Sequence, residues 1–165
     1  MSAQSFRAFV QHAYWGLDKI LEALEQSPDR LDEAVSEGAQ TARTTLRHMY
    51  MFERGFLARL RGGDSPTDPS PEDFEELRAA WEPVRQGWLD YVGSLSDELL
   101  DEPFVMPLGK DRYRTTRANV LAQFVQHQGQ HRSELAVMAS TFGYSPGEFD
   151  WWDFLEQTGQ PIEQL

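Results

Sequence analysis

The sequence predicts an all-α protein that folds as a four-helix bundle with a short extra helix near its C-terminus. Four long segments place apolar residues at steps of three and four, the spacing of a helix with one buried face. Short stretches rich in proline, glycine and small polar residues separate these segments, as loops between helices do. The chain has 165 residues, enough to bury one hydrophobic core, so we expect residues 1–165 to form a single domain.

The first two helices are expected over about residues 4–25 and 41–60. Apolar side chains from Phe6 to Leu24 share one face of the first helix, and the stretch "SPDR" then ends it. The second helix should stop at the glycine pair 62–63, because glycine readily adopts the left-handed conformation that ends a helix. Both helices therefore have an apolar face to bury in a bundle.

The third helix is predicted to begin at Ser70-Pro71-Glu72-Asp73, after the loop "DSPTDPSP". Serine is favoured just before a helix, proline at its first position, and acidic residues at the positive end of the helix dipole. The helix should run to about Leu95. Pro83 lies inside it and is expected to kink or interrupt it, because proline lacks the backbone N–H.

An irregular or hairpin-like connection is expected at residues 101–116, "DEPFVMPLGKDRYRTT", where short apolar runs flank a Gly-Lys-Asp turn. Thr115 or Thr116 should cap the fourth helix, which runs to about Phe142. The stretch "FGYSPGEFDWWDFLEQ" then predicts a turn and a short aromatic helix. Four long helices with short connections favour a bundle.

Composition and charge exclude several classes of function. With 27 acidic and 15 basic residues the net charge is -12, and phosphate would repel such a chain, so we expect no nucleic-acid partner. The chain has no cysteine, which excludes disulfides, thiolate metal ligands and a cysteine nucleophile. We find neither a signal peptide nor an apolar run of about 18 residues, so we expect a cytoplasmic protein with no membrane partner. A bound metal would have histidine, carboxylate or water ligands.

The stretch "QFVQHQGQHRSEL" holds His127 and His131, which are four residues apart. On a helix, residues with this spacing lie on one face roughly 6 Å apart, so the two imidazoles can share one ion. Helical zinc sites use the same spacing. A third ligand must come from another helix. His48 is expected to point inward from the second helix and to meet the pair if the two helices are antiparallel.

Two interpretations of this histidine pair remain open. In the first, His127 and His131 face solvent together with polar neighbours such as Gln130 and are ordinary surface residues. In the second, they face the core together with the apolar neighbours Phe124 and Leu135. Buried imidazoles so close together would each need a hydrogen-bond partner or a metal. The fourth histidine, His12, lies beside Trp15. A structural or surface role is favoured for it over metal binding, with a place beside the metal pocket as its other candidate role.

The segments "TLRHMYMFERGFLARLRGG" and "NVLAQFVQHQGQHRSELAVMASTFGYSP" together resemble the DinB/YfiT-like family of bacterial four-helix proteins. That family carries one histidine on helix two and the motif H-x3-H-R-G-Q on helix four. The resemblance covers most of the chain, from "FRAFVQHAYWGLDKIL" to "EFDWWDFL". It implies a DinB-like domain in which His48, His127 and His131 bind a divalent metal, with zinc or nickel favoured and iron or manganese as further candidates. It also implies a homodimer.

After the last histidine the chain departs from the family motif, with Ser133 and Glu134 in place of glycine and glutamine. Glu134 shares the face of the histidines and is a candidate catalytic residue. It is a general base, a weak fourth ligand, a partner that orients an imidazole, or a solvated carboxylate. Gln123, one turn before His127, is a similar candidate. Arg132 matches the family but points about 100° away from the ligand face, which favours a contact in the bundle or at an interface.

The resemblance implies a metal-dependent enzyme. Three neutral imidazoles leave the ion at least one open position, as in catalytic sites. A thiol bound there would lose its proton. Because the chain has no cysteine, we expect a small-molecule thiol and an electrophilic substrate that undergo S-transfer. The alternatives are hydrolysis by metal-bound hydroxide and a non-enzymatic, stress-associated bundle that binds a ligand. Trp151, Trp152 and Phe154 wall the pocket or, as is favoured, complete the core.

Overall fold

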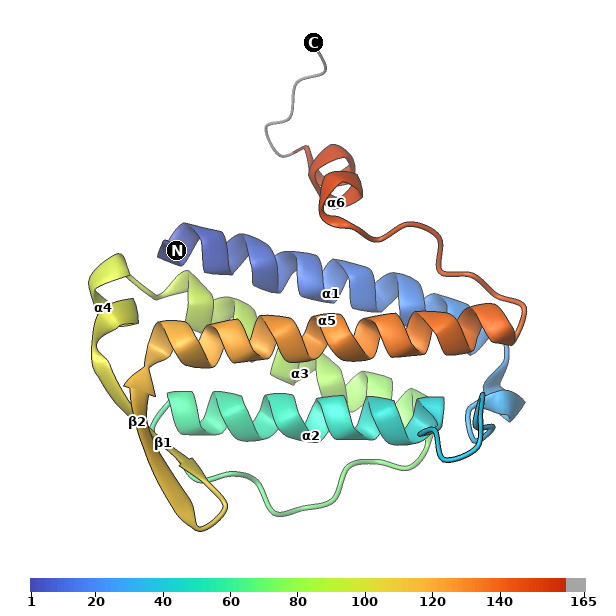
Figure 1. Ribbon diagram of the computed structural model, residues 1–165, viewed down its shortest axis with the longest axis horizontal. Coiled ribbons are helices and arrows are strands. Elements are labelled where there is room, and N and C mark those ends of the chain that lie inside the picture. Colours follow the sequence, from blue (N-terminus) through green and yellow to red (C-terminus); the bar gives the residue numbers. More distant parts are fainter. Residues whose placement is uncertain (160–165) are drawn as a thin grey trace.

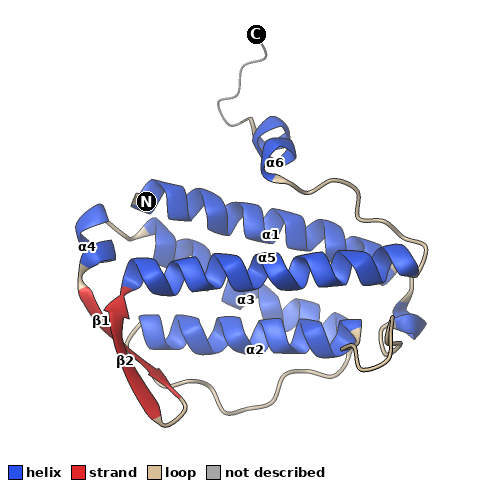
Figure 2. Cartoon of the chain, viewed as in Figure 1, coloured by secondary structure: helices blue, strands red, loops and turns tan. Residues whose placement is uncertain are grey.

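Four long helices are present, as the sequence predicts, in a computed structural model that describes residues 1–159 (Figure 1, Figure 2). The last six residues of the predicted domain, 160–165, lie outside the described residues. A small two-stranded sheet and short helices complete the fold, which confirms the all-α bundle. None of the helices in residues 1–159 is both long and apolar enough to span a membrane. In chain order the elements are α1 (Ala3–Glu25), η1 (Pro28–Arg30), α2 (Ala42–Leu60), α3 (Phe74–Gly93), α4 (Asp97–Asp101), β1 (Pro103–Leu108), β2 (Asp111–Thr116), α5 (Arg117–Thr141) and α6 (Trp151–Thr158).

The four long helices form a ring in which α1 lies against α3 and α5, and α2 lies against the same two helices. α5 runs antiparallel to α2, whereas α2 and α3 run in the same direction (Figure 1). Arg43, near the start of α2, donates a hydrogen bond to the carbonyl of Glu72, just before α3. Arg61, just after α2, donates to the carbonyl of Gly87 in the second half of α3. The connection across residues 61–73 must therefore run back along the bundle and is longer than the sequence led us to expect.

α3 begins three residues later than the sequence predicts. Asp73, not Ser70, precedes its first residue, and the Asp73 carboxylate accepts a hydrogen bond from the backbone N–H of Glu76 at 3.0 Å. The hydroxyl of Ser70 is buried and instead accepts a hydrogen bond from Nε of Arg47 at 2.8 Å. Both residues are good capping types. The contact with α2 decides between them, because it uses the Ser70 hydroxyl elsewhere.

The predicted interruption at Pro83 does not occur, and α3 continues through it as far as Gly93. Proline leaves the carbonyl four residues earlier, that of Ala79, without its helical partner. Ala79 and Pro83 both lie on the exposed side of α3, so water can bind this carbonyl. The position facing solvent explains why the helix tolerates the proline.

The connection before α5 is a regular hairpin. β1 and β2 pair antiparallel, with Pro103 opposite Thr116. Gly109 has a φ of 61° and supplies the left-handed conformation that the two-residue turn requires. Thr116 then caps α5, because its side chain accepts a hydrogen bond from the backbone N–H of Asn119 at 3.3 Å.

α6 lies outside the ring, against α1 (Figure 1). Phe154 is buried, and the ring of Trp151 packs against Phe9 with centroids 5.1 Å apart. Trp152, by contrast, is 63% exposed. Trp151 and Phe154 therefore attach α6 to α1, which agrees with the expectation that these aromatic residues complete the core. Trp152 faces solvent.

One buried carboxylate connects all four long helices. Glu53 of α2 is fully buried within the core. Three donors reach its carboxylate, one from each other long helix: Oη of Tyr14 at 2.5 Å, Nε1 of Trp81 at 2.9 Å and Nε2 of Gln128 at 2.5 Å. A buried carboxylate is tolerated where such partners replace water. Burial raises the pKa of Glu53 to about 7, although the three hydrogen bonds oppose the rise.

Replacing Glu53 by glutamine should remove a pH dependence of stability. The pKa of the folded carboxyl, about 7, lies above the ordinary value of 4.5, so the folded state favours the protonated form. The stability that this form contributes is complete below pH 4.5 and is lost as the pH rises through about 7, a change of about 3 kcal/mol. In urea unfolding, the free energy of unfolding of the wild type should therefore fall relative to that of Glu53→Gln as the pH rises. Glu22→Gln, at an exposed position of α1, is the control. The free energy of unfolding of Glu22→Gln should differ from that of the wild type by the same amount at every pH. The same constant difference for Glu53→Gln would contradict the raised pKa.

Candidate metal centre

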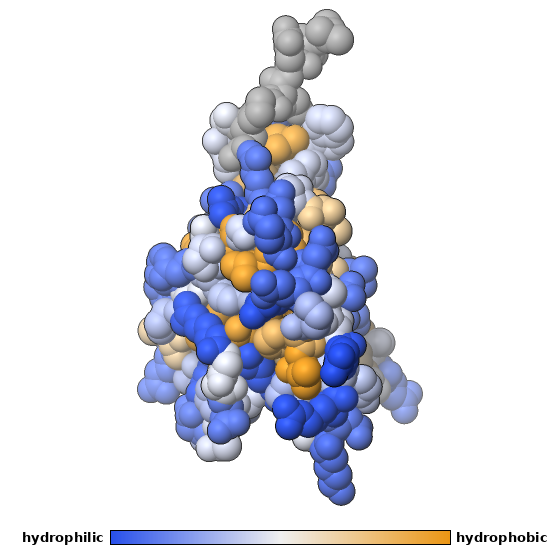
Figure 3. Space-filling model, turned by 90° about the vertical axis from the view of Figure 1, so that its left-hand side faces the viewer, coloured by the Kyte–Doolittle hydropathy of each residue, from blue (hydrophilic) through white to orange (hydrophobic). Residues whose placement is uncertain are grey.

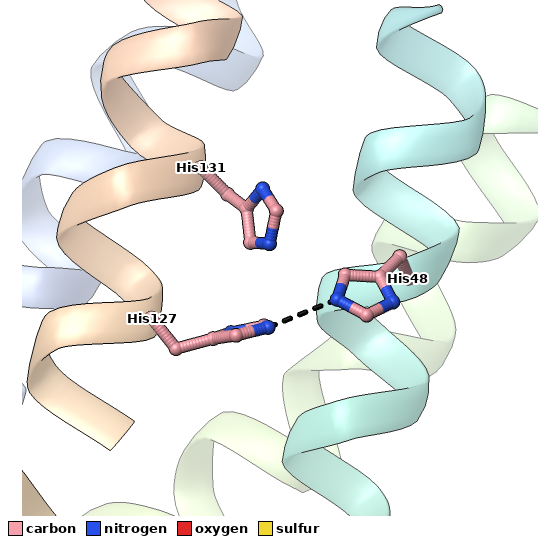
Figure 4. A group of neighbouring side chains, drawn as sticks. All are labelled: His48, His127 and His131. Carbon is pink, nitrogen blue, oxygen red and sulfur yellow. Dashed lines mark hydrogen bonds between the residues drawn. The ribbon is translucent and has the colours of Figure 1, made fainter. Parts of the chain in front are cut away.

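Three of the four histidines meet between α2 and α5 (Figure 4). His48 comes from α2, and His127 and His131 come from successive turns of α5. Each offers one ring nitrogen, and these nitrogens all lie within 4.8 Å of one another. The Nε2 atoms of His48 and His127 are 2.9 Å apart, within hydrogen-bond distance. The antiparallel packing of α2 and α5 thus brings together the three residues that the sequence singles out.

The three rings differ in their exposure to solvent. His48 is exposed, His127 is half-buried, and the side chain of His131 is 12% exposed. The rings contact one another directly, with centroid separations of 4.5 to 5.0 Å. The group therefore lies at the surface with His131 on its inner side, and small molecules can reach it from the side of His48.

A carboxylate fixes the ring of His131. Nδ1 of His131 donates a hydrogen bond to Oε2 of Glu134 at 2.6 Å, and Nε2 of Gln130 donates to the other carboxylate oxygen at 3.0 Å. Partial burial would raise the pKa of Glu134, but these two hydrogen bonds and the charge interactions with His131 and His127 together hold that pKa below its usual value. The contact leaves Nε2 of His131 available to the site. Of the four roles open for Glu134, the geometry best supports that of a partner which orients an imidazole.

The ring of His127 is oriented by stacking on a neighbouring aromatic side chain, in addition to its hydrogen bond with His48. The ring of Phe52 stacks on it with centroids 3.6 Å apart and planes 13° apart, and Phe56 stacks behind Phe52 at 3.9 Å. Within residues 1–159, Nδ1 of His127 is buried and has no hydrogen-bond partner. Phe52 also packs against the hydrophobic core, and the sequence analysis did not single it out. Its position one turn after His48 is the signal that places it beside the site.

The environment keeps two of the imidazoles neutral. Burial, together with the neighbouring His131 and His48, lowers the pKa of His127 to about 4. Burial and His131 also lower the pKa of His48. At neutral pH each of these rings therefore has an unprotonated nitrogen with a lone pair to donate, which is the form that binds a metal.

The set of donors fits a divalent ion. Bonds of about 2.0–2.1 Å to a tetrahedral ion place the ligand nitrogens roughly 3.4 Å apart. That separation lies between the closest pair, at 2.9 Å, and the 4.8 Å within which all three nitrogens fall. Small side-chain rotations are enough to reach it. Three imidazole ligands leave at least one position open, as in catalytic zinc sites.

The sequence matches the DinB superfamily over residues 12–135, a range that includes all three histidines of the group. The chain belongs to this superfamily. A comparison with curated protein sequences finds no match. Among solved structures, YfiT from Bacillus subtilis is described as a probable metal-dependent hydrolase with an unusual four-helix bundle topology. It is similar with a TM-score of 0.68 at 20% identity, covering 88% of this chain and 91% of YfiT.

Two further DinB-like proteins have similar structures. YjoA from Bacillus subtilis has a TM-score of 0.60 at 16% identity, covering 83% of this chain and 93% of YjoA. A protein from Bacillus cereus has a TM-score of 0.63 at 15% identity, covering 85% of this chain and 94% of that one. At these identities the likeness establishes a shared DinB-like fold, and function has to be argued from the site.

The remaining residues singled out in this DinB-like sequence lie apart from the three histidines. Gln123 is exposed and lines a separate cavity beneath the hairpin. Nε2 of His12 lies 3.0 Å from the carbonyl of Phe149, and the His12 ring packs against Trp151 and Phe154 of α6, so His12 belongs to the attachment of α6 and not to the metal pocket. Arg132 is buried, and its Nη1 donates to the carbonyl of His12 at 3.1 Å. This is a contact within the bundle, as its direction on the helix suggests.

Removing the Glu134 carboxylate should weaken metal binding. Glu134→Ala frees the His131 ring to rotate, and partners of this kind are worth about 10- to 100-fold in metal affinity. Competition for zinc against a chelating dye measures the loss. Ser133→Ala is the matched control, because this exposed neighbour donates to the carbonyl of Gly129 and should leave the affinity unchanged. Equal zinc affinity in Glu134→Ala and wild type would show that the carboxylate is merely solvated.

Proposed function

We propose that the chain is a metal-dependent S-transferase, in which His48, His127 and His131 hold a divalent ion and a small-molecule thiol reacts with an electrophile beside them. The observation that carries the proposal is the meeting of three imidazole nitrogens within 4.8 Å of one another. A cavity of about 450 Å³ shares His131 as part of its wall, so a substrate can bind next to the ion. An accessible ion with a neighbouring cavity is the arrangement of a catalytic centre, not of a closed structural site.

The residues of the chain supply orientation in this proposal. A divalent ion held here supplies a Lewis acid that lowers the pKa of a thiol or of water at its open position. Glu134 holds the His131 ring by a hydrogen bond, and Phe52 holds the His127 ring by stacking. His48 lies on the side from which solvent enters. Ligands that are already oriented need little reorganisation when the ion binds.

S-transfer at this centre requires a thiol from outside the chain, because the sequence has no cysteine. The cavity next to His131 offers space for the organic part of a reactant beside the ion. The cavity of about 280 Å³ beneath the hairpin has Phe56 in its wall and none of the three histidines, so it lies apart from the ion. Hydrolysis would need space for one organic substrate and a water molecule.

Hydrolysis is the second candidate function, and one observation favours it. YfiT, which has a similar fold, is described as a probable metal-dependent hydrolase. The same three histidines would hold the ion, and water would take the place of the thiol. The two candidates therefore differ in whether turnover requires an added thiol.

The purified protein is expected to hold about one divalent ion per chain. Elemental analysis should find this ion in the wild type and not in the His127→Ala, His131→Ala double variant. His12→Ala is the matched control, because His12 lies with α6, and it should retain the ion. Failure of the wild type to take up metal, even after incubation with zinc or nickel, would remove the basis of both candidate functions.

Metal-loaded protein should catalyse thioether formation. With N-acetylcysteine and monochlorobimane as probes, a carbon–sulfur bond forms, chloride leaves and the thiol proton passes to the buffer. The fluorescence of the product should rise faster with metal-loaded than with metal-free protein. Equal rates would contradict S-transfer. Metal-dependent turnover of nitrophenyl acetate without any thiol, lost in the double histidine variant, would instead support hydrolysis.

A further inference from the structure

The cavity beside His131 has a chemical character that narrows the choice of substrate. Its volume of about 450 Å³ lies within the range of small-molecule sites. Its apolar walls come from the segment before α2 and from α5, and they consist of Val35, Ala39, Val137 and Met138. His131 and Glu134 also line it, which joins the cavity to the metal centre. A molecule bound in it would therefore touch one of the three histidines.

The lining contains one charged residue, and its charge is negative. The Glu134 side chain is 41% exposed, and its carboxylate accepts hydrogen bonds from His131 and Gln130. Among the described residues that line the cavity there is neither a lysine nor an arginine. An anionic group here would face this carboxylate with no cation from the lining to offset it. The net charge of -12 acts in the same direction.

We infer that this cavity binds an uncharged, mainly apolar group, such as the aryl or alkyl part of a neutral electrophile, and that its lining, in the absence of the ion, disfavours carboxylates and phosphates. Burial against the four apolar side chains favours such a group, while the Glu134 carboxylate disfavours an anion. An ion in the metal centre would act on the reacting end of the substrate, and the remainder would lie along Val35 and Val137. The inference rests on the proposed function in calling the ligand a substrate, but binding in the cavity itself requires no metal.

The second cavity, beneath the hairpin, provides an internal comparison. Its lining combines apolar residues such as Met106 with the amides of Asn119 and Gln123, and it has no charged side chain. Figure 3 views the hairpin end of the molecule and shows hydrophobic residues among hydrophilic ones at its surface. Because this cavity has no carboxylate, it should distinguish poorly between a neutral ligand and an anion. Binding in the hairpin cavity can therefore be told from binding beside His131 in two ways: the probe contacts other residues, and a neutral probe and an anion bind about equally.

Two probes of similar shape test the inference: phenylbutyramide, which is neutral, and phenylbutyrate, which is an anion at neutral pH. NMR titration of the isotope-labelled full chain, both zinc-loaded and chelator-treated, should show shifts in the amide signals of residues 35–40 and 130–138. A dissociation constant in the millimolar range is expected for phenylbutyramide. The chelator-treated protein should bind phenylbutyrate about tenfold more weakly or worse.

Val137→Arg should reverse this preference. Val137 is 60% exposed, so the substitution should leave the fold intact while adding a cation to the cavity wall. Gln123→Arg makes a similar change at an exposed position in the hairpin cavity and should leave the preference as in wild type. Equal binding of both probes to the chelator-treated wild type, shifts confined to the hairpin cavity, or no saturable binding would each overturn the inference. Loss of metal uptake with unchanged probe binding would remove the proposed function and leave this assignment standing.

Discussion

The hydrogen bonds around Glu53 set the relation between the two helices that carry the histidines. Glu53 lies on α2 five residues after His48, and Gln128, which donates to it at 2.5 Å, stands between His127 and His131 on α5. A shift of α5 by one residue would turn its side chains by about 100° and would break this bond. It would also leave a buried carboxylate short of a partner, which is among the more costly changes in a protein core. The bond that satisfies the core therefore also fixes which face of α5 meets His48.

Exposure to solvent increases stepwise from this buried core to the outer edge of the histidine site. Gln128 is fully buried, the side chain of His131 is 12% exposed, His127 is half-buried and His48 is exposed. α5 therefore carries core contacts and site residues on neighbouring faces, and polar residues such as Gln128 and Arg132 are buried along it. A catalytic metal centre needs ligands that the core holds in place and solvent can still reach. The antiparallel pair α2 and α5 meets both needs.

Patterns along the chain predict the features that depend on local chemistry. Helical periodicity predicts the long helices, and histidine spacing together with the DinB resemblance singles out the three histidines, which the structure brings together. The start of α3 was not predictable, because Ser70 and Asp73 are equally good caps until the contact of Ser70 with α2 is known. The Glu53 cluster was missed for a similar reason. Glu53 follows Met49 by one turn on the apolar face, which signals a buried carboxylate, but its three partners come from three other helices.

The three histidines are held by three different means. His131 is fixed by a hydrogen bond to a carboxylate, His127 by stacking on Phe52, and His48 is exposed and hydrogen-bonds to His127. If these rings held a tetrahedral ion, the nitrogens of His48 and His127, here 2.9 Å apart, would need to lie roughly 3.4 Å apart. The exposed ring of His48 can supply this movement without disturbing the core. The side of the centre that faces the apolar cavity is then the fixed side, formed by His131, and the adjustable ligand lies towards solvent. A substrate placed against His131 would therefore lie beside the ligand that the chain itself holds in place.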